Sequence, residues 1–132
     1  MKEISITSTF TIFDSVSELP TTVFSLMEQA VEIRKKAYAP YSHFRVGVAI
    51  LLDNDKIVLG SNQENAAYPS GICAERVAMF SAKSTFPKQD VEEIVIVTEQ
   101  SNPFPFSPCG ACRQVLLEYE IQQKKPIKVI LK

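Results

Sequence analysis

The stretch Gly-Ile-Cys-Ala-Glu-Arg at residues 71–76 and the stretch Pro-Cys-Gly-Ala-Cys-Arg-Gln at residues 108–114 contain all three cysteines of the chain. Each stretch lies where the pattern predicts that a loop leads into a helix. A helix start offers unpaired N–H groups and a partial positive charge, and both favour the thiolate form of cysteine. If the fold brings the two helix starts together, three thiolates face one ion. The two helix starts are therefore the candidate metal site of this chain.

Zinc is the ion that such a set of ligands favours, because thiolates select it among the common ions without redox chemistry. Three protein ligands with an open fourth position are typical of a catalytic zinc site, whereas a structural site is usually closed by a fourth ligand. His43 is the only histidine and could supply that fourth ligand. A structural Cys₃His site is therefore the alternative, and a Cys-x-x-Cys pair alone also occurs in redox and structural sites.

Glu75 makes the catalytic interpretation more specific. It follows Cys73 by two residues, so its carboxylate can lie near the metal without binding it. Such a carboxylate can carry protons for a water activated by zinc, although a glutamate early in a helix can also serve only the helix dipole. The combination of Cys73-x-Glu75 with Pro-Cys-x-x-Cys at 108–112 fits the signature of zinc deaminases, with cysteine as the first ligand.

Composition excludes several other classes. The chain has 132 residues, 45% of them hydrophobic, which suits one domain with a core of ordinary size. The 14 basic and 15 acidic side chains give a net charge of -1, which disfavours a nucleic-acid binder. An odd number of cysteines does not suit a disulfide scaffold. No secretory signal and no apolar run of about 18 residues is present, so we expect a cytoplasmic protein without a membrane partner.

Hydrophobic periodicity predicts alternating strands and helices, in the order β-α-β-β-α-β-α-β. A layered α/β domain with a mixed sheet follows from that order. Residues 1–20 are expected to form an N-terminal strand and a linker, ahead of a domain over residues 21–132. The expected strands are 3–13, 44–52, 56–60, 91–98 and 127–131, the expected helices are 21–39, 72–84 and 109–119, and residues 99–108, with three prolines, are expected to form a loop.

From about Tyr38 to Leu117 the chain resembles the small, homotetrameric, zinc-dependent cytidine deaminases. Besides the two cysteine stretches, the resemblance includes Tyr-Ser-His-Phe at 41–44 and Asn-Gln-Glu-Asn-Ala-Ala-Tyr-Pro at 62–69. It implies a three-layer α-β-α sandwich with a mixed sheet of five strands. Members of that family usually continue through a further strand and a short tail, which this sequence lacks, so we expect either a truncated chain or compensation by the N-terminal strand at residues 3–13.

The resemblance implies a role for each residue that matches the family's motifs. Five residues are concerned with the metal and the reaction: the ligands Cys73, Cys109 and Cys112, the proton carrier Glu75, and Arg76, which hydrogen-bonds the ligating sulfurs. Four residues are concerned with the substrate: Asn62 and Glu64 at the ribose 3′ hydroxyl, Phe44 against the pyrimidine ring, and the Ala74 N–H at the base carbonyl. Tyr68 is expected near a subunit boundary.

Some of these residues have ordinary alternatives. Asn62 and Glu64 can be polar loop residues, and Phe44 can belong to the core because it leads an apolar strand. We expect His43 to be a structural residue rather than a ligand. Arg76 has a physical rationale, because a cation that donates to the sulfurs withdraws negative charge from a three-thiolate zinc site.

The resemblance implies hydrolytic deamination of cytidine and 2′-deoxycytidine in pyrimidine salvage, by a homotetramer. One alternative is a deaminase of another nucleoside-like compound, such as blasticidin S. A nucleic-acid deaminase is less favoured, since those enzymes usually carry histidine as the first ligand and this chain has no net positive charge. A non-enzymatic zinc module is the alternative from a different class, and it requires His43 on the metal.

Overall fold

The computed structural model describes residues 1–99 and 104–132. These residues form three α-helices and four β-strands, with short 3-10 turns at Val16–Glu18 and Tyr68–Ser70. The helices are α1 (Thr21–Arg34), α2 (Ala74–Thr85) and α3 (Gly110–Gln123), and the strands are β1 (Val46–Leu52), β2 (Ile57–Ser61), β3 (Val91–Thr98) and β4 (Lys128–Leu131).

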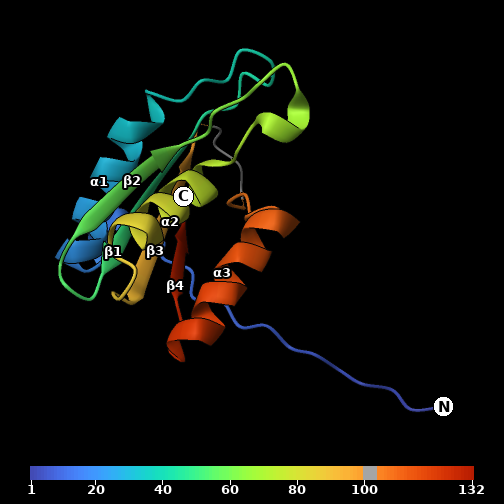
Figure 1. Ribbon diagram of the computed structural model, residues 1–132. Helices are drawn as coiled ribbons and strands as arrows, with labels where there is room; N and C mark the ends of the chain where they lie inside the picture. Colours follow the sequence, from blue (N-terminus) through green and yellow to red (C-terminus); the bar gives the residue numbers. More distant parts are fainter. Residues whose placement is uncertain (100–103) are drawn as a thin grey trace.

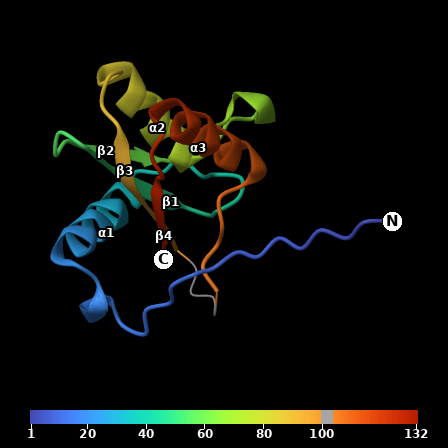
Figure 2. The same ribbon diagram turned by 90° about the horizontal axis from the view of Figure 1, so that it is seen from below.

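The strands form one mixed sheet in the order β2-β1-β3-β4. β1 pairs with β2 and with β3 in antiparallel fashion, while β3 and β4 are parallel. Helix α1 covers one face of the sheet, and α2 and α3 cover the other (Figures 1 and 2). This arrangement confirms the predicted three-layer α-β-α sandwich, with four strands rather than five in the described part of the chain.

Each face of the sheet has its own core, and the two central strands contribute to both. In β1, Val48 and Ile50 pack toward α2, while Ala49 packs toward α1. Because both faces are covered, β1 and the later part of β3, from Ile94 to Val97, are continuous apolar runs instead of alternating ones. The layer that contains α2 and α3 holds the larger of the two cores, and these two helices carry the cysteines.

Two glycines let the helices lie directly on the strands. A Cβ atom at Gly47 would lie 2.0 Å from the carbonyl oxygen of Ala30 in α1. A Cβ atom at Gly60 would lie 2.6 Å from the backbone nitrogen of Ala78 and 2.7 Å from the carbonyl oxygen of Ala74 in α2. No side chain fits at either point, so backbone contact determines how closely each helix approaches the sheet.

The strand expected over residues 3–13 was wrong. The segment contains no strand, and its apolar residues Ile4, Ile6, Phe10 and Ile12 are between 79% and 90% exposed. It extends away from the domain in both views (Figures 1 and 2). An alternating pattern forms a strand only when a neighbouring strand takes up its backbone hydrogen bonds, and β4 and β2 remain the sheet edges.

The first helix is shorter than the predicted 21–39. It ends at Arg34, because the chain is then drawn into an extended bridge. The Tyr38 N–H donates to the Asn62 carbonyl, and the Glu64 N–H donates to the Tyr38 carbonyl. The other predicted elements agree with the structure to within four residues at each end. The loop expected over 99–108 includes residues 100–103, which lie outside the described residues.

Candidate metal centre

The three cysteines lie at the starts of two neighbouring helices. Cys73 is the N-cap residue of α2 and Cys109 is the N-cap residue of α3, while Cys112 lies in the first turn of α3. Neither cap thiol hydrogen-bonds a backbone N–H of its own helix, so both sulfurs are available for other partners. The fold thus brings together the two stretches from which the sequence predicted a metal site.

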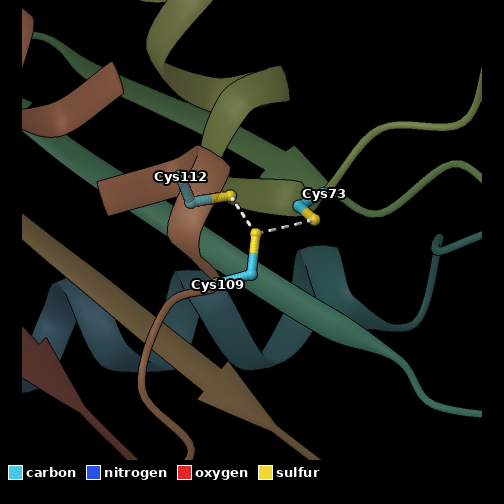
Figure 3. Close-up of side chains that lie close together, drawn as sticks. All are labelled: Cys73, Cys109 and Cys112. Atoms are coloured by element: carbon cyan, nitrogen blue, oxygen red, sulfur yellow. Dashed lines mark hydrogen bonds between the residues drawn. The ribbon is translucent and has the colours of Figure 1, made fainter. Parts of the chain in front are cut away.

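The spacing of the sulfurs fits a tetrahedral ion. The Sγ atoms of Cys73 and Cys109 are 3.9 Å apart, and those of Cys109 and Cys112 are 3.5 Å apart (Figure 3). Zinc–sulfur bonds of about 2.3 Å at tetrahedral angles place sulfurs about 3.8 Å apart. A disulfide requires about 2.05 Å, and all three thiols are free. The donor set therefore fits zinc.

The fourth position of this site has no protein ligand among the described residues. The cluster of metal-binding side chains within 4.8 Å of one another consists of the three cysteines alone. His43 is not part of it; this residue is exposed and has a left-handed backbone conformation with φ 53°. A Cys₃His centre is thus not what the structure shows, and three ligands with an open position match the catalytic type.

The thiols differ in their electrostatic surroundings. A hydrogen bond from Cys112, supported by others from Arg76 and Cys109, lowers the pKa of Cys73 to about 5. The shared hydrogen bond with Cys73, together with burial, raises the pKa of Cys112. Nη2 of Arg76 donates to Sγ of Cys73 over 3.6 Å. The metal-free site therefore keeps a thiolate at Cys73 and a proton at Cys112.

Glu75 is a buried carboxyl group beside this cluster. Burial raises its pKa above the ordinary value, and the negative charge of Cys73 adds to that effect. Its exposed fraction is only 7%, in the first turn of α2. A carboxyl group whose pKa lies closer to neutrality exchanges protons more readily near pH 7 than an exposed one.

Asn62 holds the chain around Phe44. Its side-chain amide donates to the Phe44 carbonyl over 2.9 Å and accepts from the Val46 N–H over 2.8 Å. An amide side chain has two donor hydrogens and two acceptor lone pairs. One donor and one acceptor position therefore remain on Asn62 for a ligand.

Glu64 is held by the loop that precedes Phe44. Oε2 accepts from the N–H groups of Tyr41 and Ser42, at 2.9 Å and 3.2 Å, and Oε1 accepts from the Ser42 hydroxyl. The hydrogen bond from the Ser42 hydroxyl is the main cause that lowers the pKa of Glu64. Of about four acceptor positions on a carboxylate, one remains, on Oε1.

Phe44 contacts a residue that the sequence reasoning did not single out. Its ring lies edge-to-face against Phe106, with centroids 5.1 Å apart and planes at 78°. Phe106 lies two residues before the cysteine stretch 108–114, so this contact joins the loop around Phe44 to the segment that leads into α3. The only signal for it in the sequence is an aromatic residue in a proline-rich loop, which by itself predicts nothing.

The two remaining predicted residues differ in exposure. Ala74 is fully buried as the first residue of α2, and its N–H is one of those that a helix leaves without an internal partner. Tyr68 is 91% exposed at the start of a 3-10 turn. In this single chain Tyr68 therefore contributes nothing to the core.

Together, the α/β sandwich and the open three-thiol centre define a zinc enzyme. Comparison with known protein families identifies the class of enzyme. The family model of the cytidine and deoxycytidylate deaminase zinc-binding region matches residues 21–125. The chain belongs to this deaminase family. No helix in the described ranges is long and apolar enough to cross a membrane.

Individual relatives agree with this assignment. A cytidine deaminase of Halalkalibacterium halodurans is 45% identical over 93 residues, which is 70% of this chain and 68% of that protein. The crystal structure of cytidine deaminase from Burkholderia pseudomallei superposes with a TM-score of 0.73 at 41% identity, over 83% of each chain. For the Mycobacterium tuberculosis enzyme the TM-score is 0.67 at 35% identity, over 76% of this chain and 79% of that one.

Proposed function

We propose that this protein hydrolyses the 4-amino group of cytidine and 2′-deoxycytidine, giving uridine or 2′-deoxyuridine and ammonia. The observation that carries the proposal is the buried Glu75 next to three thiols whose spacing fits one tetrahedral ion. Family membership and the similarity to named cytidine deaminases support it.

Cys73, Cys109 and Cys112 would hold the zinc ion through their sulfurs. When bound, zinc supplies Lewis acidity that lowers the pKa of a coordinated water. Arg76 donates to the Cys73 sulfur and so reduces the negative charge that three thiolates place on the site.

Glu75 is the proposed proton carrier. Its carboxylate takes a proton from the attacking water and delivers it to N3 of the cytosine ring. The oxygen of the water bonds to C4, Glu75 carries the remaining proton of that hydroxyl to the 4-amino group, and the C4–N bond breaks to release ammonia. The raised pKa of Glu75, caused first by burial, suits a group that must both accept and release protons near neutral pH.

Asn62 and Glu64 are the proposed contacts of the ribose 3′ hydroxyl. The free acceptor position on Glu64 and the free donor on Asn62 match a hydroxyl, which donates one hydrogen bond and accepts another. Phe44 would pack on the pyrimidine ring, and the N–H of Ala74, at the first position of α2, would donate to the base carbonyl.

One ultraviolet assay with zinc-loaded protein tests this function. Cytidine and 2′-deoxycytidine should both be deaminated, while free cytosine, which lacks the sugar hydroxyl, should be a poor substrate. Blasticidin S and a cytosine-containing oligonucleotide serve as parallel substrates for the competing deaminases. Failure of the protein to act on cytidine, with a full complement of zinc, would refute the proposal.

We also propose that the active protein is a homotetramer with Tyr68 near a subunit boundary. The exposed aromatic ring of Tyr68 and the other exposed apolar side chains of the single chain support association. Analytical ultracentrifugation should give a mass near four times 14.7 kDa. A Tyr68→Ser variant should shift this equilibrium toward smaller species. A role in cytoplasmic pyrimidine salvage is part of the same proposal.

A further inference from the structure

The hydroxyl of Ser42 lies between two of the proposed substrate contacts. Its Oγ accepts a hydrogen bond from the Phe44 N–H over 3.0 Å and donates one to Oε1 of Glu64. A hydroxyl has one donor hydrogen, and here that hydrogen is given to the carboxylate. The single atom Oγ therefore joins the residue proposed at the sugar to the residue proposed at the base.

The backbone around Ser42 is shaped for this double contact. His43 adopts a left-handed conformation, with φ 53°, so the chain turns back and the Phe44 N–H faces the Ser42 side chain. The N–H groups of Tyr41 and Ser42, in the turn just before His43, donate to the other oxygen of Glu64. Glu64 itself is a loop residue 22 positions away in the sequence.

We propose that Ser42 is a positioning residue that couples recognition of the sugar by Glu64 to the placement of Phe44 against the base. This inference rests on the proposed function and adds a residue to which no role has been given. Ser42 acts through its two neighbours and need not touch the substrate.

The chemical consequence concerns which lone pair Glu64 presents. Two N–H donors hold Oε2, so the Ser42 hydroxyl is the contact that fixes Oε1 and leaves it one acceptor position. Without the hydroxyl, Oε1 has two free positions that water occupies, and a sugar hydroxyl must displace that water. The Phe44 N–H loses its acceptor at the same time.

The test compares wild type with Ser42→Ala and Ser42→Thr, which keeps a hydroxyl. Ser25→Ala, on the exposed side of α1, is the matched control. The substrates are cytidine and 3′-deoxycytidine, and the measured quantity is the ratio of their kcat/KM values. We expect Ser42→Ala to reduce this ratio about tenfold, mainly through KM for cytidine, as the loss of one charge-assisted hydrogen bond implies. Ser42→Thr and Ser25→Ala should keep the ratio.

A Ser42→Ala variant that keeps the wild-type ratio overturns the proposal. The proposal is also overturned if both substrates lose kcat/KM equally, because that result indicates general damage to the fold. If the wild-type protein does not act on cytidine, the proposed function fails, and this inference fails with it.

A second measurement is independent of activity. Titration of the Glu64 carboxyl group by NMR should show its lowered pKa rising toward the ordinary value in Ser42→Ala, while Ser42→Thr retains the lowered pKa. An unchanged pKa in a folded Ser42→Ala variant means that the hydroxyl does not bind Glu64, and it refutes the inference whatever the enzyme does.

Discussion

Nη2 of Arg76 donates to Sγ of Cys73 across 3.6 Å, so a cation directly contacts one of the three sulfurs. Three thiolates and Zn²⁺ sum to one negative charge, and a metal with that much donated charge is a weak Lewis acid. Hydrogen bonds to ligating atoms tune a metal in this way.

We therefore expect Arg76→Gln to lower kcat by about 10- to 100-fold, the range usual for partners of metal ligands. Steady-state kinetics of the zinc-loaded variant measure this, with zinc content determined in parallel. Arg113→Gln is the matched control, because Arg113 is an exposed arginine in the first turn of α3. Equal kcat values for Arg76→Gln and Arg113→Gln would show that the Arg76 contact has no role in the reaction.

Replacement of the buried carboxyl group should separate proton transfer from metal binding. Glu75→Gln keeps the size of the side chain and removes the titrating group, so kcat should fall at least 100-fold while zinc is retained. Metal analysis and single-turnover kinetics together measure this. The control is Glu118→Gln, an exposed position on α3. Near-normal turnover by zinc-loaded Glu75→Gln would contradict the proposed mechanism.

The metal-free protein should show unequal thiol reactivity. Because hydrogen bonds lower the pKa of Cys73 to about 5, its thiolate predominates at every pH above that value. The pKa of Cys112 is raised, so this thiol stays protonated through neutral pH. Iodoacetamide at pH 6.5 should therefore modify Cys73 well before Cys112, as peptide mass spectrometry can show, because the thiolate is the reactive form.

Zinc should suppress that reaction, since the ion occupies the same sulfurs. We expect one equivalent of zinc per chain to protect Cys73 from modification by iodoacetamide. Modification of Cys112 first in the metal-free protein, or equal rates for both residues, would show that the proton lies elsewhere in the cluster.

The edge-to-face contact of Phe106 with Phe44 predicts a change in substrate affinity. Such aromatic pairs contribute about 0.5–1.5 kcal/mol beyond their buried area. Phe106→Ala should therefore raise KM for cytidine about two- to tenfold with little change in kcat. Phe104→Ala is the control, because Phe104 is 77% exposed in the same loop. Matching KM values for the two variants would argue against a role of the pair in holding Phe44.

The sequence predicted the layered fold and the metal cluster because both follow from local signals. Helix starts at the cysteines and β-branched runs such as 91–98 are visible without knowledge of tertiary contacts. The predicted strand at 3–13 failed for the opposite reason. The alternating pattern of residues 3–13 shows which side chains would share one face of a strand. Whether a strand forms depends on a neighbouring strand elsewhere in the fold.

The contacts around Phe44 show the same limit within the site. Asn62 and Glu64 were expected to bind substrate, yet no spacing rule indicates that both side chains also hold the segment from Tyr41 to Val46. Phe106 contacts Phe44, which is distant in the sequence. Ser42 contacts the distant Glu64 and also the Phe44 N–H, which the left-handed residue His43 turns toward it. Such contacts are properties of the folded chain.

The close approach of α2 to β2 at Gly60 has a consequence for how this domain can change over evolutionary time. Cys73 and Ala74 lie at the N-terminal end of α2, and the Ala74 carbonyl is one of the atoms that a Cβ atom at Gly60 would meet. Gly60 therefore determines how close the Cys73 end of α2 lies to the sheet. Core side chains can be exchanged for others of similar volume, because neighbours repack. No exchange compensates for a methyl group wedged between two backbones. Natural or designed substitutions can therefore replace many core residues and keep the arrangement of the three sulfurs, provided that position 60 remains glycine.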